Sequence, residues 1–192
     1  MAEFDEFLET LKKTAAVLRE ADVPFLLGGG LAAWARGGPE TAHDLDYMVR
    51  PRDADRALEA LEGAGLRSAK PPEGWLYKAW DGDTLVDVIF QPSGGEVDDA
   101  MFERADLLDV QAVLMNVMSL EDVLTTKLLS MREHEVDYEG VLEIARALRE
   151  QVDWETVRER TSESPYARAF FFLAEELEII QPEPAEAREA SR

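Results

Sequence analysis

Two aspartates, Asp44 and Asp46, have the residue type and spacing that chemistry on a charged substrate requires. They stand two positions apart at the start of an expected β-strand, so their carboxylates project from the same face of it. Like charges this close are unfavourable unless a cation compensates them, and Mg²⁺ prefers such hard oxygen ligands. The pair predicts a metal site, and an exposed acidic turn is the alternative in a chain this rich in acids.

Asp87 is the third candidate metal ligand. It stands in the apolar run of residues 85–90, where an ionised carboxylate needs a partner. If this strand lies beside the strand of Asp44 and Asp46, the three carboxylates converge and can hold two Mg²⁺ ions about 3.5–4 Å apart, an arrangement that supports in-line phosphoryl displacement. The alternative for Asp87 is an edge strand on which it faces solvent.

Three glycines, Gly28, Gly29 and Gly30, lie between the apolar run 23–27 and a short helix expected over residues 31–36. Without Cβ atoms their backbone N–H groups can approach a phosphate closely, and the start of the following helix favours an anion. A tight strand-to-helix turn is the plainer interpretation. Together with the carboxylates, the glycines predict a nucleoside triphosphate site.

The elements that position these side chains follow from hydrophobic periodicity and turn residues. Strands are expected over residues 23–27, 45–49, 75–80, 84–90 and 113–117, with Asp81, Gly82 and Asp83 as a hairpin turn and residues 91–96 as a loop. Helices are expected over residues 3–21, 31–36, 53–63, 120–133, 138–150, 154–160 and 165–179. The predicted fold class is α/β (α+β), a small mixed sheet flanked by helices with a C-terminal helical part.

The organisation along the chain follows from this pattern. Residues 1–118 form the expected sheet-and-helix core, and residues 119–180 form helices packed on it, beginning at the capping-box-like pair Ser119 and Asp122. Residues 181–192 carry two prolines and alternating Ala and Glu, which predicts a disordered tail.

The charge balance of the chain limits its partners. With 20 basic and 41 acidic residues, the net charge is −21, which disfavours a nucleic-acid partner because binding draws on Lys and Arg contacts to phosphate. A small cationic or neutral molecule is the better electrostatic match. Alternatively, the acidity serves solubility alone.

The compartment is inferred from what the sequence lacks. There are no cysteines, which excludes disulfides and thiolate chemistry and is compatible with a reducing cytoplasm. The charged first residues do not resemble a signal peptide, and no apolar run approaches the roughly 18 residues of a membrane span. A cytoplasmic protein without a membrane partner is expected, and the oligomeric state stays open.

Residues 27–34, Leu-Gly-Gly-Gly-Leu-Ala-Ala-Trp, and 41–46, Thr-Ala-His-Asp-Leu-Asp, followed by Asp87, resemble the signature of the polymerase-β-like nucleotidyltransferase superfamily. The similarity covers about residues 25–140 and is greatest to the minimal bacterial branch, with AbiEii-type toxins and lincosamide and aminoglycoside nucleotidyltransferases. It implies a nucleotidyltransferase that moves an NMP from an NTP to an acceptor hydroxyl and releases pyrophosphate, with Mg²⁺ or Mn²⁺ as cofactor.

The resemblance also implies roles for individual residues. Asp44 and Asp46 would ligate both metals, and Asp87 would ligate the catalytic metal and help to deprotonate the acceptor hydroxyl. The implied nucleotide-binding residues are Gly28, Gly29, Gly30, Thr41 and Lys127. Many family members carry Ser at the position of Gly30, so either nucleotide binding is weaker here or a backbone amide suffices.

Some positions have two interpretations. Lys127 lies in a stretch, residues 119–129, that resembles the AbiEii helix that supplies a lysine to the triphosphate, but it also fits a surface lysine. Arg132, His134 and Asp137 resemble a downstream motif of that group or are a charged helix end. His43 orients Asp46, faces substrate or is solvated.

The function keeps alternatives too. The acceptor is expected to be a small molecule. The alternatives are a toxin–antitoxin enzyme acting on tRNA or protein, a catalytically inactive nucleotide-binding module of the same fold, and a structural partner protein that uses its acidic surface. The base preference of the NTP stays open.

Overall fold

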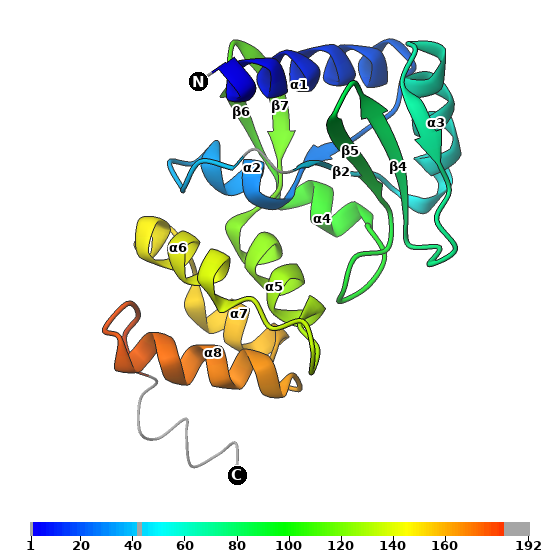
Figure 1. Cartoon of the computed structure of the whole chain (residues 1–192). Helices are drawn as coiled ribbons and strands as arrows, with labels where there is room; N and C mark the ends of the chain where they lie inside the picture. The colour runs from blue at the N-terminus through cyan, green and yellow to red at the C-terminus, as the bar shows by residue number, and fades with distance from the viewer. Residues whose placement is uncertain (1, 42–43, 183–192) are drawn as a thin grey trace.

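The computed structural model describes residues 2–41 and 44–182, which form one seven-stranded sheet and eight α-helices (Figure 1). The strands are β1 (Leu26–Leu27), β2 (Asp44–Met48), β3 (Arg67–Ala69), β4 (Leu76–Asp81), β5 (Thr84–Ile89), β6 (Asp106–Val110) and β7 (Val113–Val117). The helices are α1 (Ala2–Glu20), α2 (Gly29–Trp34), α3 (Ala54–Gly63) after the 3-10 turn η1 (Pro51–Asp53), α4 (Asp99–Glu103), α5 (Leu120–Ser130), α6 (Tyr138–Leu148), α7 (Trp154–Arg160) and α8 (Pro165–Glu176).

The sheet has the strand order β3-β4-β5-β2-β1-β7-β6. Strands β2 and β5 are parallel, as are β1 and β7, and the other neighbours are antiparallel, so the predicted mixed sheet is confirmed. Because β2 and β5 are neighbours in register, Asp46 lies directly opposite Asp87.

The two faces of β2 differ in chemistry because side chains alternate along a strand. Leu45 and Tyr47 are fully buried on one face, and the Tyr47 hydroxyl contacts Thr14 Oγ1 of α1 at 2.8 Å. Asp44 and Asp46 lie on the opposite face and are only half-buried. The apolar face of β2 thus packs on α1. Because side chains alternate along the strand, both carboxylates lie on the other side of the sheet.

The buried side chains form two hydrophobic clusters. The first joins α1, the strands and α3, and the second joins α5, α6, α7 and α8 with Ala33 of α2. In Figure 1 the helices α5–α8 lie beneath the sheet, on the side away from α1. Helix α2 contacts both β2 and α5, and it therefore connects the strand that carries two aspartates to the C-terminal helices.

Most expected elements are present, and the differences have local causes. The helix expected to reach residue 133 ends at Ser130, because Met131 is extended and a bridge pairs Arg132 with Glu135. The hairpin turn is confirmed, since Asp81 pairs with Thr84 and Gly82 has a positive φ of 60°. The strand expected over residues 23–27 is only two residues long.

Three short elements were not expected from the sequence. Strand β3 has three residues and α4 has five, which is too short for a periodic pattern. Strand β6 lies at the edge of the sheet, and its apolar residue Leu107 is 59% exposed. Apolar and polar residues therefore do not alternate along β6 as they do along a half-buried strand. The turn from β6 to β7 has Gln111 and Ala112 at positive φ. Glycine or asparagine is the usual residue there, so the sequence carried no signal for this hairpin.

The ends and boundaries are described only in part. The division expected between residues 118 and 119 stays a prediction, and it coincides with the passage from β7 to α5. Most of the tail expected to be disordered, residues 183–192, lies outside the described residues, as do residues 42 and 43. None of the helices in the described part of the chain combines the length and apolar character needed to cross a bilayer.

A buried carboxylate, Asp122 of α5, joins this helix to α7 and to the end of α4. Ser119 caps α5 as expected, accepting a hydrogen bond from the Asp122 N–H. The Asp122 carboxylate is fully buried and accepts hydrogen bonds from Arg104, after α4, and from Arg160 of α7. Burial alone would raise the pKa of Asp122, but the hydrogen bonds from the two arginines outweigh it and lower the pKa below 3.8.

Replacing Asp122 by Asn is expected to lower the free energy of unfolding by about 3 kcal/mol, because two guanidinium groups lose their charged partner. Urea denaturation measures this loss. Because the folded-state pKa is depressed, the contribution of Asp122 is present above the unfolded value and is lost as the pH falls below it. The stability difference between wild type and Asp122→Asn should therefore shrink below about pH 4.

The matched control is Asp106→Asn, which removes an ion pair to Arg36 in which the aspartate is 61% exposed. Although Arg36 is only 11% exposed, it keeps its hydrogen bonds to the carbonyl oxygens of Val117 and Met118 in this variant, so the expected loss is smaller, about 1 kcal/mol. Equal losses in the two variants would contradict the structural importance of Asp122.

Candidate active site

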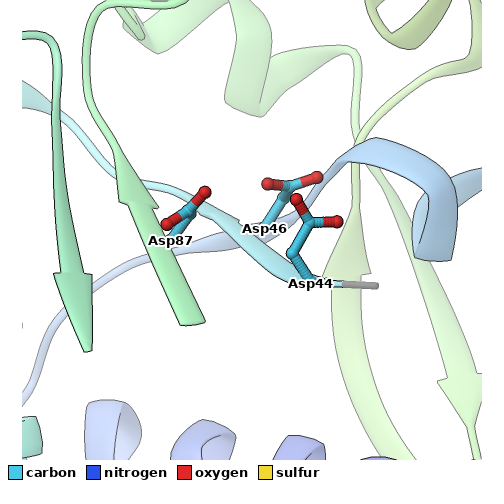
Figure 2. Close-up of side chains that lie close together, drawn as sticks. All are labelled: Asp44, Asp46 and Asp87. Atoms are coloured by element: carbon cyan, nitrogen blue, oxygen red, sulfur yellow. The ribbon is translucent and has the colours of Figure 1, made fainter. Parts of the chain in front are cut away.

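The three predicted metal ligands meet on one face of the sheet. One oxygen from each of Asp44, Asp46 and Asp87 lies within 4.8 Å of the others, and Figure 2 shows the three side chains projecting from the neighbouring strands, Asp44 and Asp46 from β2 and Asp87 from β5. The parallel register of these strands causes the convergence, because it sets Asp46 beside Asp87. Three clustered carboxylates offer the hard oxygen donors that Mg²⁺ and Mn²⁺ prefer.

The electrostatics of the cluster favour a bound cation. Burial, followed by the charges of Asp44 and Asp87, raises the pKa of Asp46 to about 7, against the opposing effect of Lys127 and Lys78. Burial is also the largest cause of the raised pKa of Asp87. Both shifts mean that the ionised carboxylates are under-compensated by the protein itself, so the donor set fits a divalent cation.

Gly28 and Gly29 shape the space around Asp46. The Gly28 N–H donates a hydrogen bond of 2.8 Å to the Asp46 carbonyl oxygen, so this N–H serves the sheet and cannot also bind a phosphate. Gly29 has a φ of 55°, and a Cβ there would overlap Oδ2 of Asp46. Glycine is required at position 29 because the carboxylate occupies the place of a side chain.

Thr41 fills the space beside Gly30. A Cβ on Gly30 would come 2.9 Å from Cγ2 and 3.1 Å from Oγ1 of Thr41, which is too close for the threonine to stay in place. The Thr41 hydroxyl therefore lies beside Gly30. The departure at Gly30 is thus accompanied by a threonine packed on it.

Two lysines flank the carboxylates from different elements. Lys127 of α5 is half-buried, and its positive charge acts against the rise in the pKa of Asp46. Lys78 of β4, which the sequence analysis did not select, lies with Nζ 3.2 Å from Oδ1 of Asp87. The predicted hairpin could have identified Lys78 from the sequence, because a turn that pairs Asp81 with Thr84 also pairs Lys78 with Asp87.

The downstream motif is not brought into the cluster by any observed contact. Asp137 caps α6 by accepting hydrogen bonds from the N–H groups of Glu139 and Gly140. Arg132 forms the bridge with Glu135, and His134 is exposed. These positions therefore have structural roles or face solvent. His43 lies outside the described residues.

Comparison with known proteins supplies the class. Residues 6–177 match the sequence model of a family described as uncharacterised nucleotidyltransferases, and the chain belongs to this family. Among curated proteins, no match by sequence was found.

Solved structures share the fold. ANT(2″)-Ia in complex with adenylyl-2″-tobramycin is 16% identical, with 84% of this chain and 97% of that chain covered and a TM-score of 0.62. The lincosamide antibiotic adenylyltransferase LnuA, bound to lincomycin, is 12% identical, with coverage of 81% and 97% and a TM-score of 0.52. An antigenic nucleotidyltransferase-like protein from Paracoccidioides brasiliensis is 15% identical, with coverage of 90% and 93% and a TM-score of 0.52. These similarities confirm the predicted nucleotidyltransferase fold.

Replacing Gly29 by Ala is expected to abolish measurable Mn²⁺ binding, because the new methyl group displaces the Asp46 carboxylate. Isothermal titration calorimetry of the purified variant measures this. The control is Gly65→Ala, at a φ of 92° with nothing within 4 Å of the added Cβ, which carries backbone strain of about 1 kcal/mol without touching the site. Retained Mn²⁺ binding in Gly29→Ala would contradict the assignment of Asp46.

The metal-free protein is expected to lose stability as the pH rises from 4 to 7. The pKa of Asp46 is raised from 3.8 to about 7, so the folded state holds a proton that the unfolded state releases. Asp46→Asn should remove this decline and stabilise the metal-free protein above pH 7 by an amount on the order of a few kcal/mol. Urea denaturation with a chelator at pH 5 and pH 8 tests it, and parallel pH profiles for both proteins would contradict it.

Proposed function

We propose that this protein transfers an NMP from an NTP to a hydroxyl of a small-molecule acceptor, with Mg²⁺ or Mn²⁺, and releases pyrophosphate. The observation that carries the proposal is the meeting of Asp44, Asp46 and Asp87 within 4.8 Å. Membership of a nucleotidyltransferase family supports the reaction class.

In this mechanism Asp44 and Asp46 would hold two divalent cations, and Asp87 would hold one of them. When bound, these cations neutralise charge on the phosphates and acidify the acceptor hydroxyl. Asp87 takes the hydroxyl proton, and because burial raises its pKa it is a stronger proton acceptor than an ordinary aspartate. The hydroxyl oxygen then bonds to the α-phosphorus, the bond from this phosphorus to the bridging oxygen of the β-phosphate breaks, and pyrophosphate leaves.

The triphosphate lies, in this proposal, between the glycine turn and α5. Gly29 and Gly30 have N–H groups at the first turn of α2, and Thr41 provides a hydroxyl beside them. Gly28 contributes by fixing the turn to β2, because its N–H is bonded to Asp46. Lys127 of α5, the lysine that the family resemblance assigns to the triphosphate, binds the phosphates.

The acceptor class follows from charge and from the neighbouring structures. A net charge of −21 favours a cationic or neutral small molecule over a nucleic acid. The fold neighbours carry adenylyl-tobramycin and lincomycin, both antibiotic-derived small molecules with hydroxyl groups. A reaction that consumes NTP also fits the cytoplasm expected from the cysteine-free sequence.

The proposal predicts pyrophosphate release when the protein is mixed with Mg²⁺, a panel of four NTPs and hydroxylated aminoglycosides and lincosamides. Asp46→Asn and Asp87→Asn should each reduce the rate at least about 100-fold, because each removes charge stabilisation of the transition state. Asp106→Asn, remote from the cluster, should keep the wild-type rate.

The other outcomes separate the alternatives. Growth arrest on expression, relieved by Asp46→Asn, would indicate a tRNA or protein target. Binding of NTP and Mg²⁺ without any transfer would indicate an inactive nucleotide-binding module. If the protein neither binds NTP nor transfers a nucleotide, the proposed function is contradicted.

A further inference from the structure

Lys78 is a charged neighbour of the three aspartates to which neither the sequence analysis nor the proposed function assigns a role. Its Nζ lies 3.2 Å from Oδ1 of Asp87, and its side chain is 31% exposed against 9% for Asp87. The contact is fixed by the antiparallel pairing of β4 with β5, which sets the two residues opposite each other. Among the described residues, Asp87 is the ion-pair partner found for Lys78.

The contact uses one of the two oxygens of Asp87. Figure 2 shows one Asp87 oxygen turned toward Asp46 and the other turned away from it. The charge of Lys78 also reaches Asp46. A divalent cation that approaches Asp87 therefore meets a positive charge already in hydrogen-bonding contact with that carboxylate, and the two cations repel each other.

We propose that Lys78 is a tethered cation that holds Asp87 in the nucleotide-free protein and moves to the α-phosphate when the NTP binds. The consequence is that a divalent cation binds weakly by itself and tightly together with the triphosphate. This inference rests on the proposed nucleotidyltransferase function, and it adds Lys78 to the residues that contact the substrate.

The α-phosphate is the group within reach of Lys78 for a geometric reason. Asp87 takes the proton of the hydroxyl that attacks the α-phosphorus, so the reacting phosphate lies beside Asp87, and Lys78 already contacts that carboxylate. The lysine stem has four carbons and a compact ammonium with three donors, which suits a move between two neighbouring anions. The side chain is 31% exposed, so it is not enclosed by the core.

The first test measures Mn²⁺ binding alone by isothermal titration calorimetry. Lys78→Met should bind Mn²⁺ about tenfold more tightly than wild type, because a repelling charge is removed. Lys78→Arg, which keeps the charge, should stay near wild type. Lys70→Met is the matched control: it removes a lysine in a 2.5 Å ion pair with Asp55, exposed on both sides, and should leave Mn²⁺ affinity unchanged.

The second test measures binding of Mg²⁺ together with an ATP analogue that has a methylene group between the α- and β-phosphates. Lys78→Met should weaken this binding about tenfold, and Lys78→Arg should restore most of it. Unchanged or weaker Mn²⁺ binding in Lys78→Met, or unchanged analogue binding, would overturn the proposal for Lys78. A wild-type protein that binds no analogue would instead contradict the proposed function, so the two failures are distinguishable.

Discussion

The fold of this protein must hold three carboxylates that repel one another on one face of a sheet. Asp44, Asp46 and Asp87 lie within 4.8 Å of one another, and burial together with this repulsion raises the pKa of Asp46 to about 7. No sequence pattern makes such a cluster stable by itself. It persists because the remainder of the fold holds β2 and β5 together, and because the cluster is suited to a divalent cation.

The scaffold that tolerates this repulsion is apolar and hydrogen-bonded elsewhere. On the opposite face of β2, Tyr47 is fully buried and its hydroxyl bonds to Thr14 and to the Leu11 carbonyl. On the cluster's own face, Gly29 leaves room for the Asp46 carboxylate. Beyond it, Asp122 joins α4, α5 and α7 through two arginines. Local instability at the site is thus offset by packing and buried hydrogen bonds around it.

Two lysines approach the carboxylates from opposite elements, Lys78 from β4 and Lys127 from α5. Neither lysine neutralises the cluster, because the pKa values of Asp46 and Asp87 stay raised. The net charge of −21 attracts cations and repels polyanions. The arrangement of charges around the three aspartates therefore indicates the function more directly than the shape of any cavity.

The sequence by itself determined the local features: the alternation that separates Leu45 from Asp46, the Gly82 turn, and the capped start of α5 at Ser119. These depend on residues close together in the chain, where periodicity and turn chemistry act directly. Even the pairing of Lys78 with Asp87 could have been derived from that turn. The tertiary structure alone decided that β2 lies beside β5, that the charge of Lys127 acts on Asp46, and that β3 and β6 lie at the two edges of the sheet. Such neighbours are set by burial of the whole sheet, for which no short segment carries a signal.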